Sequence, residues 1–129
     1  MIVLDTHAWI WWATDTGDLS QGASETIEAA NRIGICTISC WEVAQLVGRK
    51  RLQLTLGVER WVRRALADPR VVVLGLDATT AVHAGGLDYG NFPGDPADRI
   101  IYATAVEHGV RLVTRDAAIS AFDPARVTW

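Results

Sequence analysis

The sequence predicts an α/β domain with a central parallel β-sheet of four to five strands, flanked by helices on both faces. Two observations carry this prediction. Short apolar segments alternate along the chain with longer segments of helical periodicity. The apolar segments contain few polar residues, which is typical of strands covered on both faces. The 129 residues fit one compact unit, so we expect residues 1–129 to form a single domain.

The first third of the chain supplies two of these strands. The expected elements are a strand at residues 2–4, a helix at 7–13, a loop at 15–22, a helix at 23–32 and a strand at 33–38. A further helix is expected to begin at Ser39. Ser39 and Glu42 have the spacing of a capping box, and Val43, Leu46 and Val47 share one helical face.

The rest of the chain repeats the alternation. The expected elements are a helix at 57–67, a strand at 71–76, a helix from Asp77 to about Ala84, a loop at 89–96, a helix at 96–108, a strand at 110–114, and a short helix before a last strand near Val127. Pro96 suits the first helical position with Asp95 as its N-cap. Gly109 suits the residue that ends the same helix.

Four acidic residues are expected at one edge of this sheet. Asp5 and Asp116 follow strands, and Glu42 lies just past a third. Asp98 begins the helix that feeds the strand ending at Thr114, and in a right-handed crossover that helix starts at the carboxyl edge. Each acid also has a structural explanation as a helix cap or a partner of the helix dipole. Open α/β sheets nevertheless carry their sites at this edge.

Four carboxylates at one site repel each other unless a cation is present. Magnesium prefers oxygen ligands and often links carboxylates to phosphate, so Mg²⁺ is the expected cofactor, with Mn²⁺ as an alternative. The three histidines are scattered, and the two cysteines, Cys36 and Cys40, form neither a zinc pattern nor a disulfide framework. We expect both cysteines to be free thiols.

The charge of the chain is unevenly distributed. The net charge is −3, but residues 49–70 carry +5 and the remainder −8. An acidic site beside a basic window suits a metal-dependent nuclease, so we interpret the window as a contact for a nucleic-acid backbone. A solvated helix face would give the same pattern. The basic residues are Arg49, Lys50, Arg51, Arg60, Arg63, Arg64 and Arg70.

Three of the six tryptophans lie in the first expected helix. Trp9 and Trp12 share a face by their i, i+3 spacing, whereas Trp11 points elsewhere. An exposed indole there would suit the binding of a partner protein, and core packing is the alternative. Trp61 and Trp129 are expected to pack.

No stretch of about 18 apolar residues is present, so no membrane span is expected. The N-terminus has no basic leader, and Asp5 interrupts its apolar run, so we do not expect a signal peptide. These features favour a cytoplasmic location.

Four short motifs resemble those of PIN-domain nucleases, in the same order and at similar spacing. They are residues 1–8 (MIVLDTHA), 38–43 (ISCWEV), 95–101 (DPADRII) and 112–116 (LVTRD). The resemblance covers essentially the whole chain. The chain length and the continuation HAWIWW at residues 7–12 resemble the VapC toxins of toxin–antitoxin pairs.

This resemblance implies a metal-dependent endoribonuclease that hydrolyses RNA phosphodiester bonds, forms a homodimer and binds a small VapB-type antitoxin. The catalytic carboxylates map onto Asp5, Glu42, Asp98 and Asp116. Thr6 and Thr114 fall where the family often has a hydroxyl near the site. We interpret Asp95 mainly as a helix cap. It remains open whether Asp95 also supports the residues that bind the metal or is itself an outer metal ligand.

We expect Asp5 and Asp98 to be the main direct metal ligands. Glu42 and Asp116 would act directly or through metal-bound water, and the sequence does not choose which of them takes the proton from the attacking water. Arg99 and Arg115 are each expected either to neutralise the acids, to touch a phosphate or to form a plain ion pair.

Three other functions are alternatives to this prediction. A receiver-like phosphoacceptor domain would need a lysine after a late strand, but the only lysine is Lys50. A non-catalytic module with a PIN-like fold does not explain the complete acid set. A PIN nuclease that acts in RNA maturation or on DNA is not separated from a toxin by these residues.

Overall fold

The computed structural model describes residues 1–129 and has the expected α/β architecture. Its sheet has five parallel strands in the order β3-β2-β1-β4-β5. The strands are β1 (Ile2–Leu4), β2 (Ile33–Cys36), β3 (Val71–Leu74), β4 (Arg111–Val113) and β5 (Val127–Thr128). The prediction of a parallel sheet covered on both faces is therefore confirmed.

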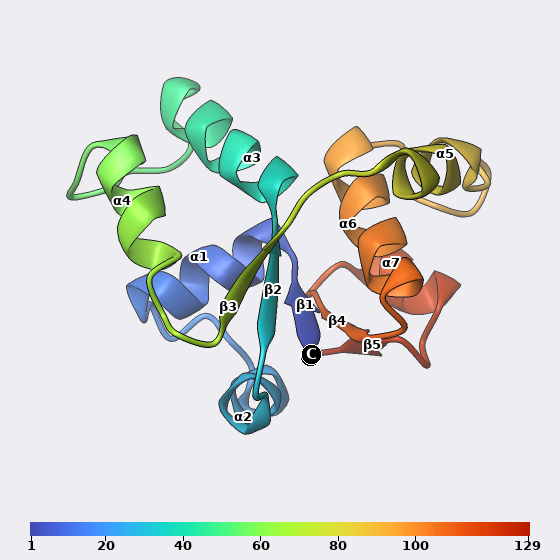
Figure 1. Cartoon of the computed structure of the whole chain (residues 1–129), viewed down its shortest axis with the longest axis horizontal. Coiled ribbons are helices and arrows are strands. Elements are labelled where there is room, and N and C mark those ends of the chain that lie inside the picture. Colours follow the sequence, from blue (N-terminus) through green and yellow to red (C-terminus); the bar gives the residue numbers. More distant parts are fainter.

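Seven helices surround the sheet (Figure 1). They are α1 (Thr6–Thr14), α2 (Gln21–Ala29), α3 (Thr37–Gly48), α4 (Val58–Ala65), α5 (Ala78–Gly86), α6 (Pro96–Glu107) and α7 (Ala117–Phe122). Helices α1 and α4 lie on one side of the sheet, and α5, α6 and α7 lie on the other. None of these helices is both long and apolar enough to span a bilayer.

The side chains of β1 alternate between two apolar cores because successive strand residues point to opposite faces. Ile2 and Leu4 join the core under α1, α2 and α4. Val3 joins the core under α6 and α7. All three side chains are buried, as the uniformly apolar strand predicts. Burial on both faces fixes β1 as the rigid centre from which Asp5 emerges.

Two predicted helix boundaries are confirmed by their caps. Asp95 caps α6 with Pro96 in the first turn. Gly109 follows the end of α6 with φ of 64°, a left-handed conformation that glycine adopts without steric cost. The remaining helix boundaries agree with the expected ones to within a few residues.

The predicted capping box at Ser39 and Glu42 is wrong. Helix α3 begins two residues earlier, at Thr37, and Cys36 occupies the N-cap position without a side-chain hydrogen bond. The strand that precedes it consequently ends at Cys36 and not at residue 38. Ser39 lies inside the helix and is buried, so its hydroxyl serves a tertiary contact instead of a cap.

Candidate active site

The four predicted acids line one cleft at the carboxyl edge of the sheet. The cleft has a volume of about 410 Å³, and its wall also includes Asp95. In the order β3-β2-β1-β4-β5 the direction of the strand order reverses between β1 and β4, and Asp5 and Asp116 follow these two strands. This is the switch point at which open α/β sheets form a crevice. The remaining lining residues are Thr6, His7, Trp11 and Arg115.

Asp5 and Asp116 are held in the cleft by the helices that they cap. Asp5 follows β1, and its Oδ1 accepts a hydrogen bond of 2.7 Å from the Ala8 amide at the start of α1. Asp116 accepts bonds of 2.8 and 2.9 Å from the first amides of α7, again on Oδ1. The structural and functional explanations of these acids are therefore compatible, because capping occupies only one carboxylate oxygen.

Asp95 and Asp98 reach the cleft from the first turn of α6. Asp95 caps this helix by accepting from the amides of Ala97 at 2.9 Å and Asp98 at 3.4 Å. The prediction that Asp95 is a cap is confirmed, and the same side chain also faces the cleft. Asp98 has no side-chain hydrogen bond, so both of its oxygens are free to bind a ligand.

Glu42 is positioned differently, by two hydroxyl groups. The Thr6 hydroxyl donates to Oε1 of Glu42 and lies 3.0 Å from the Ser39 hydroxyl. Because each hydroxyl has one proton, both contacts are satisfied when Ser39 donates to Thr6 and Thr6 donates to Glu42. This relay between α1 and α3 explains why Ser39 is buried. The local sequence pattern places Ser39 at a helix cap, so this relay of hydroxyl groups is not apparent from the sequence.

The carboxylates raise each other's proton affinity. Burial, followed by the nearby charges of Asp95, Glu42, Asp116 and Asp5, raises the pKa of Asp98 to about 7. Burial also raises the pKa of Asp5 and of Glu42, although the Thr6 hydrogen bond opposes this shift in Glu42. The cleft therefore holds more negative charge than its surroundings compensate, and a bound cation would be stabilised there.

The donors in the cleft fit a hard cation. All of the acidic side chains offer oxygen, the ligand that Mg²⁺ prefers. No three acidic, histidine or cysteine side chains stand as a ready group of metal ligands. This arrangement is compatible with Mg²⁺, which is commonly held by one or two carboxylates and several waters. A metal that requires thiolate ligands has no support, since Cys36 is buried and Cys40 does not line the cleft.

The other predicted hydroxyl, Thr114, is buried beside the site. Its Oγ1 accepts a hydrogen bond of 3.1 Å from the Asp116 amide. Thr114 thereby fixes the segment that joins β4 to α7, and with it the position of Asp116. Thr6 and Thr114 therefore each position one acid of the cleft, Glu42 and Asp116 respectively.

The structure separates the three tryptophans of α1. Trp9 is completely buried against Trp61, with ring centroids 5.1 Å apart, so its predicted role in partner binding is wrong. Trp11 lines the acid cleft. Trp12 lines a different hollow, between α1 and α4. Helical spacing alone could not distinguish these surroundings.

The basic window of residues 49–70 does not line the acid cleft. Arg60, Arg63 and Arg64 line a separate hollow on α4. In Figure 1, α4 lies on the far side of α3 from α6. The role of Arg49, Lys50, Arg51 and the arginines of α4 in RNA binding stays a prediction, and the structure gives it no direct connection to the acids.

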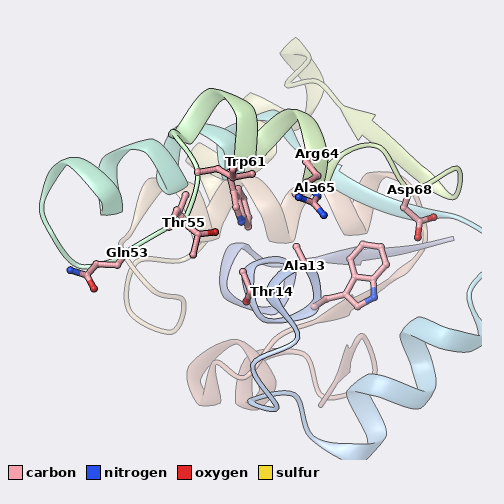
Figure 2. Close-up of a pocket in the computed structure, with 11 residues that line it drawn as sticks. Ala13, Thr14, Gln53, Thr55, Trp61, Arg64, Ala65 and Asp68 are labelled. Carbon is pink, nitrogen blue, oxygen red and sulfur yellow. The ribbon is translucent and has the colours of Figure 1, made fainter.

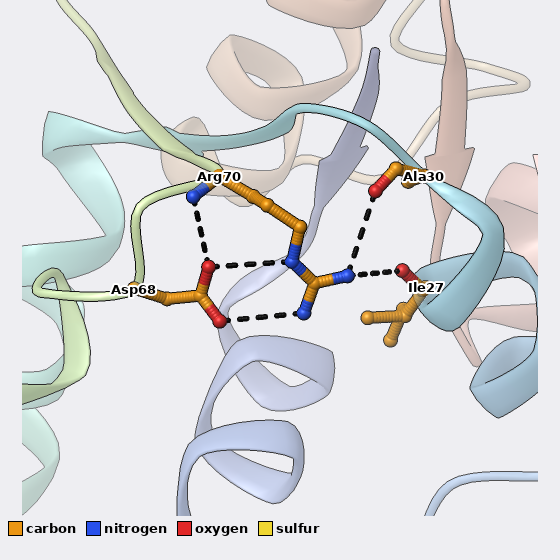
Figure 3. A network of polar contacts seen from close by, with 4 residues as sticks. All are labelled: Ile27, Ala30, Asp68 and Arg70. Carbon is orange, nitrogen blue, oxygen red and sulfur yellow. Dashed lines mark hydrogen bonds and ion pairs between the residues drawn. The ribbon is translucent and has the colours of Figure 1, made fainter.

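Arg70, the last residue of the basic window, has a structural role (Figure 3). Its guanidinium donates to the carbonyls of Ile27 at 3.2 Å and Ala30 at 3.5 Å. It also pairs with Asp68 at 3.3 Å. Arg70 therefore ties the end of α2 to the start of β3, and these bonds leave it poorly placed to bind a phosphate.

Arg99 and Arg115 form no ion pair, which corrects one of their expected roles. Arg99 is 3% exposed and donates to the carbonyls of Ala84 at 3.0 Å, Pro93 at 3.2 Å and Leu87. It faces away from the acid cleft, so it neither neutralises the acids nor contacts a phosphate there. Arg115 is exposed and lines the cleft.

Comparison with known proteins agrees with this geometry. The family model described as PIN domain matches residues 2–123. The chain is 43% identical to Ribonuclease VapC22 of Mycobacterium tuberculosis (strain ATCC 25618 / H37Rv) over 115 residues, which cover 89% of this chain and 86% of that protein.

Solved structures show the same fold at lower identity. The toxin-antitoxin complex from Klebsiella pneumoniae matches with a TM-score of 0.68 at 23% identity, over 98% of this chain and 95% of the other. The toxin VapC20 of Mycobacterium tuberculosis matches with a TM-score of 0.69 at 16% identity, over 95% of each chain. With the family match and the 43% identity, these likenesses lead to one conclusion: the chain belongs to the PIN domain family, among its VapC-type members.

Proposed function

We propose that this protein is a magnesium-dependent endoribonuclease and acts as the toxin of a type II toxin–antitoxin pair. The observation that carries the proposal is the cleft in which Asp5, Glu42, Asp98 and Asp116 meet. The relative at 43% identity is named a ribonuclease, which supports RNA as the substrate. The excess of negative charge in the cleft supports a divalent cation as the cofactor.

Each acid has a role that its position supports. Asp5 and Asp98 would hold the metal directly, because helix capping occupies only Oδ1 of Asp5 and the Asp98 carboxylate accepts no hydrogen bond. Magnesium would supply stabilisation of the negative charge that develops on the phosphate. Glu42 and Asp116 are the candidates for accepting the proton of the attacking water. The Thr6 hydroxyl keeps Glu42 oriented toward the cleft.

The first test is cleavage of total RNA by the purified protein. We expect discrete cleavage with Mg²⁺, none with a chelator, and a loss of about 100-fold or more in the Asp98→Asn variant. Gel analysis of the products checks this, with Asp18→Asn on the exposed α1–α2 loop as the matched control. Intact RNA together with a protein that binds no metal would contradict catalysis and leave a PIN-fold binding module.

Parallel assays on DNA, on precursor RNA and in growing cells separate this proposal from the alternative functions. Faster cleavage of DNA than of RNA would indicate a DNA nuclease. Cleavage confined to trimming of precursor RNA would indicate a role in RNA maturation. A toxin should instead cut RNA in a way that stops growth when the chain is expressed alone.

We infer that a VapB-type antitoxin binds in the hollow between α1 and α4. The Klebsiella pneumoniae structure is a toxin–antitoxin complex with the same fold, which supports such a partner. The hollow has a volume of about 530 Å³ and a largely apolar lining that includes Trp12, Leu54 and Leu56, with one cation, Arg64, and one anion, Asp68. Figure 2 shows Trp61 and Arg64 of α4 facing Ala13 and Thr14 of α1. An amphipathic segment with an apolar face would complement this lining.

This inference predicts that Trp12→Glu weakens antitoxin binding by tenfold or more, since truncation or reversal of a central aromatic contact costs roughly 2 kcal/mol. The partner to test is the small protein that we expect to be encoded next to this chain. Isothermal titration measures the affinity, with Trp41→Glu as the control because Trp41 is exposed outside the hollow. Equal affinities of the two variants would place the antitoxin elsewhere.

A homodimer and a cytoplasmic location complete the proposal. Four large hydrophobic side chains of one segment are exposed, namely Val73, Leu76, Val82 and Tyr89, with Val82 77% exposed. Of these, Leu76 and Tyr89 line one hollow beside α5, and exposed apolar surface of this kind supports self-association around α5.

A further inference from the structure

The acid cleft is also lined by three side chains that are not acidic and that the proposed metal site does not use. His7, Trp11 and Arg115 line the cleft together with the acids. The Trp11 ring lies 5.7 Å from the His7 ring and 5.7 Å from the Trp129 ring. We call Trp11 and Arg115 the aromatic wall. It places a large π-surface and a cation directly beside five carboxylates.

Arg115 is the more unusual member of the wall. It is an exposed guanidinium at the edge of an acidic cleft, yet it forms neither an ion pair nor a hydrogen bond. Its guanidinium lies over the Trp11 ring, 5.9 Å from the centroid, which is near the outer limit of about 6 Å for a cation–π interaction. The guanidinium is therefore free to bind an anion that enters the cleft.

Trp11 is held in place from behind. The Trp129 ring packs against it at an angle of 60°. The backbone carbonyl of Trp129 lies 3.1 Å from where a Cβ at Gly22 would stand, so α2 packs tightly against the C-terminus. An indole supported in this way loses little conformational freedom when a second ring stacks on it.

We propose that the aromatic wall binds one unpaired nucleotide of the substrate, with the base stacked on Trp11 and a phosphate held by Arg115. This inference rests on the proposed function and names the form of RNA that the cleft accepts. Stacking on an indole requires an exposed base face, which a base-paired helix does not offer. The protein should therefore select single-stranded segments or loops.

The choice of an RNA strand over an acidic peptide follows from the combination of groups. A peptide carboxylate could pair with Arg115, but it would leave the aromatic surface of Trp11 unused. A nucleotide uses the ring and the guanidinium together. It also brings a phosphodiester that a cation on the carboxylates would attract.

Binding is tested by fluorescence anisotropy with a labelled 12-nucleotide single-stranded RNA in the presence of Ca²⁺, with a gel to verify that the RNA stays intact. We expect Trp11→Leu to weaken binding by about tenfold, in the range reported for loss of one stacked base. Trp11→Tyr should keep most of the affinity, because it keeps a stacking face. Trp41→Leu removes an indole that is 55% exposed outside the cleft and should bind like the wild type.

Two further readouts separate binding from folding. Arg115→Gln should reduce the slope of log Kd against log salt by about one, the effect of one lost phosphate contact, whereas the exposed Arg32→Gln should not. A 12-base-pair duplex should bind more weakly, with no difference between Trp11→Leu and the wild type. Equal affinity of Trp11→Leu and wild type for the single strand would overturn the proposal, as would an equal loss in Trp41→Leu.

Cleavage kinetics distinguish failure of this inference from failure of the proposed function. With Mg²⁺, Trp11→Leu should raise KM about tenfold and change kcat little, because stacking acts on a base that does not react and is the same before and in the transition state. If the wild type cleaves RNA and Trp11→Leu has the same KM, the proposal that the aromatic wall binds a nucleotide is overturned. The proposed nuclease function would then still stand. Trp11-dependent binding without any cleavage would leave the wall standing and overturn the nuclease.

Discussion

Replacing Asp98 with asparagine is expected to abolish cleavage and at the same time to stabilise the metal-free protein. The variant removes a carboxylate whose ionised form is disfavoured by burial and by four neighbouring acids. At pH 8 without metal we expect a gain of about 1–2 kcal/mol, allowing for solvent screening of a partly exposed group. This corresponds to a rise of roughly 5 °C in Tm.

The pH dependence follows from the direction of the shift. The pKa of Asp98 is raised to about 7 in the folded protein, above the ordinary aspartate value of 3.8. A raised pKa gives stability that is fully present at low pH and is lost as the pH rises through the folded value. The difference in Tm between wild type and Asp98→Asn should therefore increase as the pH rises from 4 to 8. At pH 8 the variant should have the higher Tm.

Thermal melts with and without metal check this prediction. Mg²⁺ should raise the Tm of the wild type at pH 8 because it binds the folded state, and it should raise the Tm of Asp98→Asn much less. Asp18→Asn, on the exposed loop between α1 and α2, serves as the charge-matched control. A metal-free Asp98→Asn protein that melts below the wild type at pH 8 would contradict the electrostatic account of the cleft.

The second large effect is expected at Arg99, through stability. This guanidinium is buried and donates to three backbone carbonyls, one in the last turn of α5 and two in the segment between α5 and α6. It also stacks under the exposed Tyr89 ring, 3.9 Å from the centroid. Arg99→Met would leave three carbonyls without their donors in a buried position. We expect a loss of about 3 kcal/mol or more, since each unsatisfied group costs roughly 1–3 kcal/mol.

Chemical denaturation measures the loss, with Arg32→Met as the matched control. Arg32 is exposed and should change stability by less than about 0.5 kcal/mol. Limited proteolysis should cut Arg99→Met between residues 85 and 95, because the loop loses the group that gathers its carbonyls. Cleavage of RNA should weaken as well, since the same loop leads into Asp95 and Asp98. Equal stability of the two variants would show that the carbonyls find other donors.

The contrast between Arg99 and Arg115 shows where sequence reasoning stops. Both arginines adjoin a predicted acid in the chain, and the sequence offers the same explanations for each. In the structure one is buried among carbonyls on the far side of α6, and the other lines the acid cleft. On a helix, consecutive residues point about 100° apart, so adjacency to Asp98 places Arg99 away from the cleft.

Glu42 and Ser39 show a related limit. The capping-box spacing is a local pattern, and local patterns compete with tertiary contacts for the same side chains. Here the Thr6 hydroxyl, 36 residues from Glu42 in the chain, takes the place of the backbone amide that the pattern predicts. Glu42 still reaches the cleft, because one turn of helix after β2 brings it to the same edge of the sheet.

The sequence by itself determined the alternation of strands and helices, the parallel sheet and the edge at which the four acids gather. These features follow from periodicity, caps and the handedness of crossovers, which are local or topological rules. Only the tertiary structure decided which basic and aromatic side chains accompany the acids. It buried Trp9, turned Trp12 toward α4 and left Trp11 beside the carboxylates. The surroundings of a side chain depend on which distant elements pack against it, and no local pattern encodes that information.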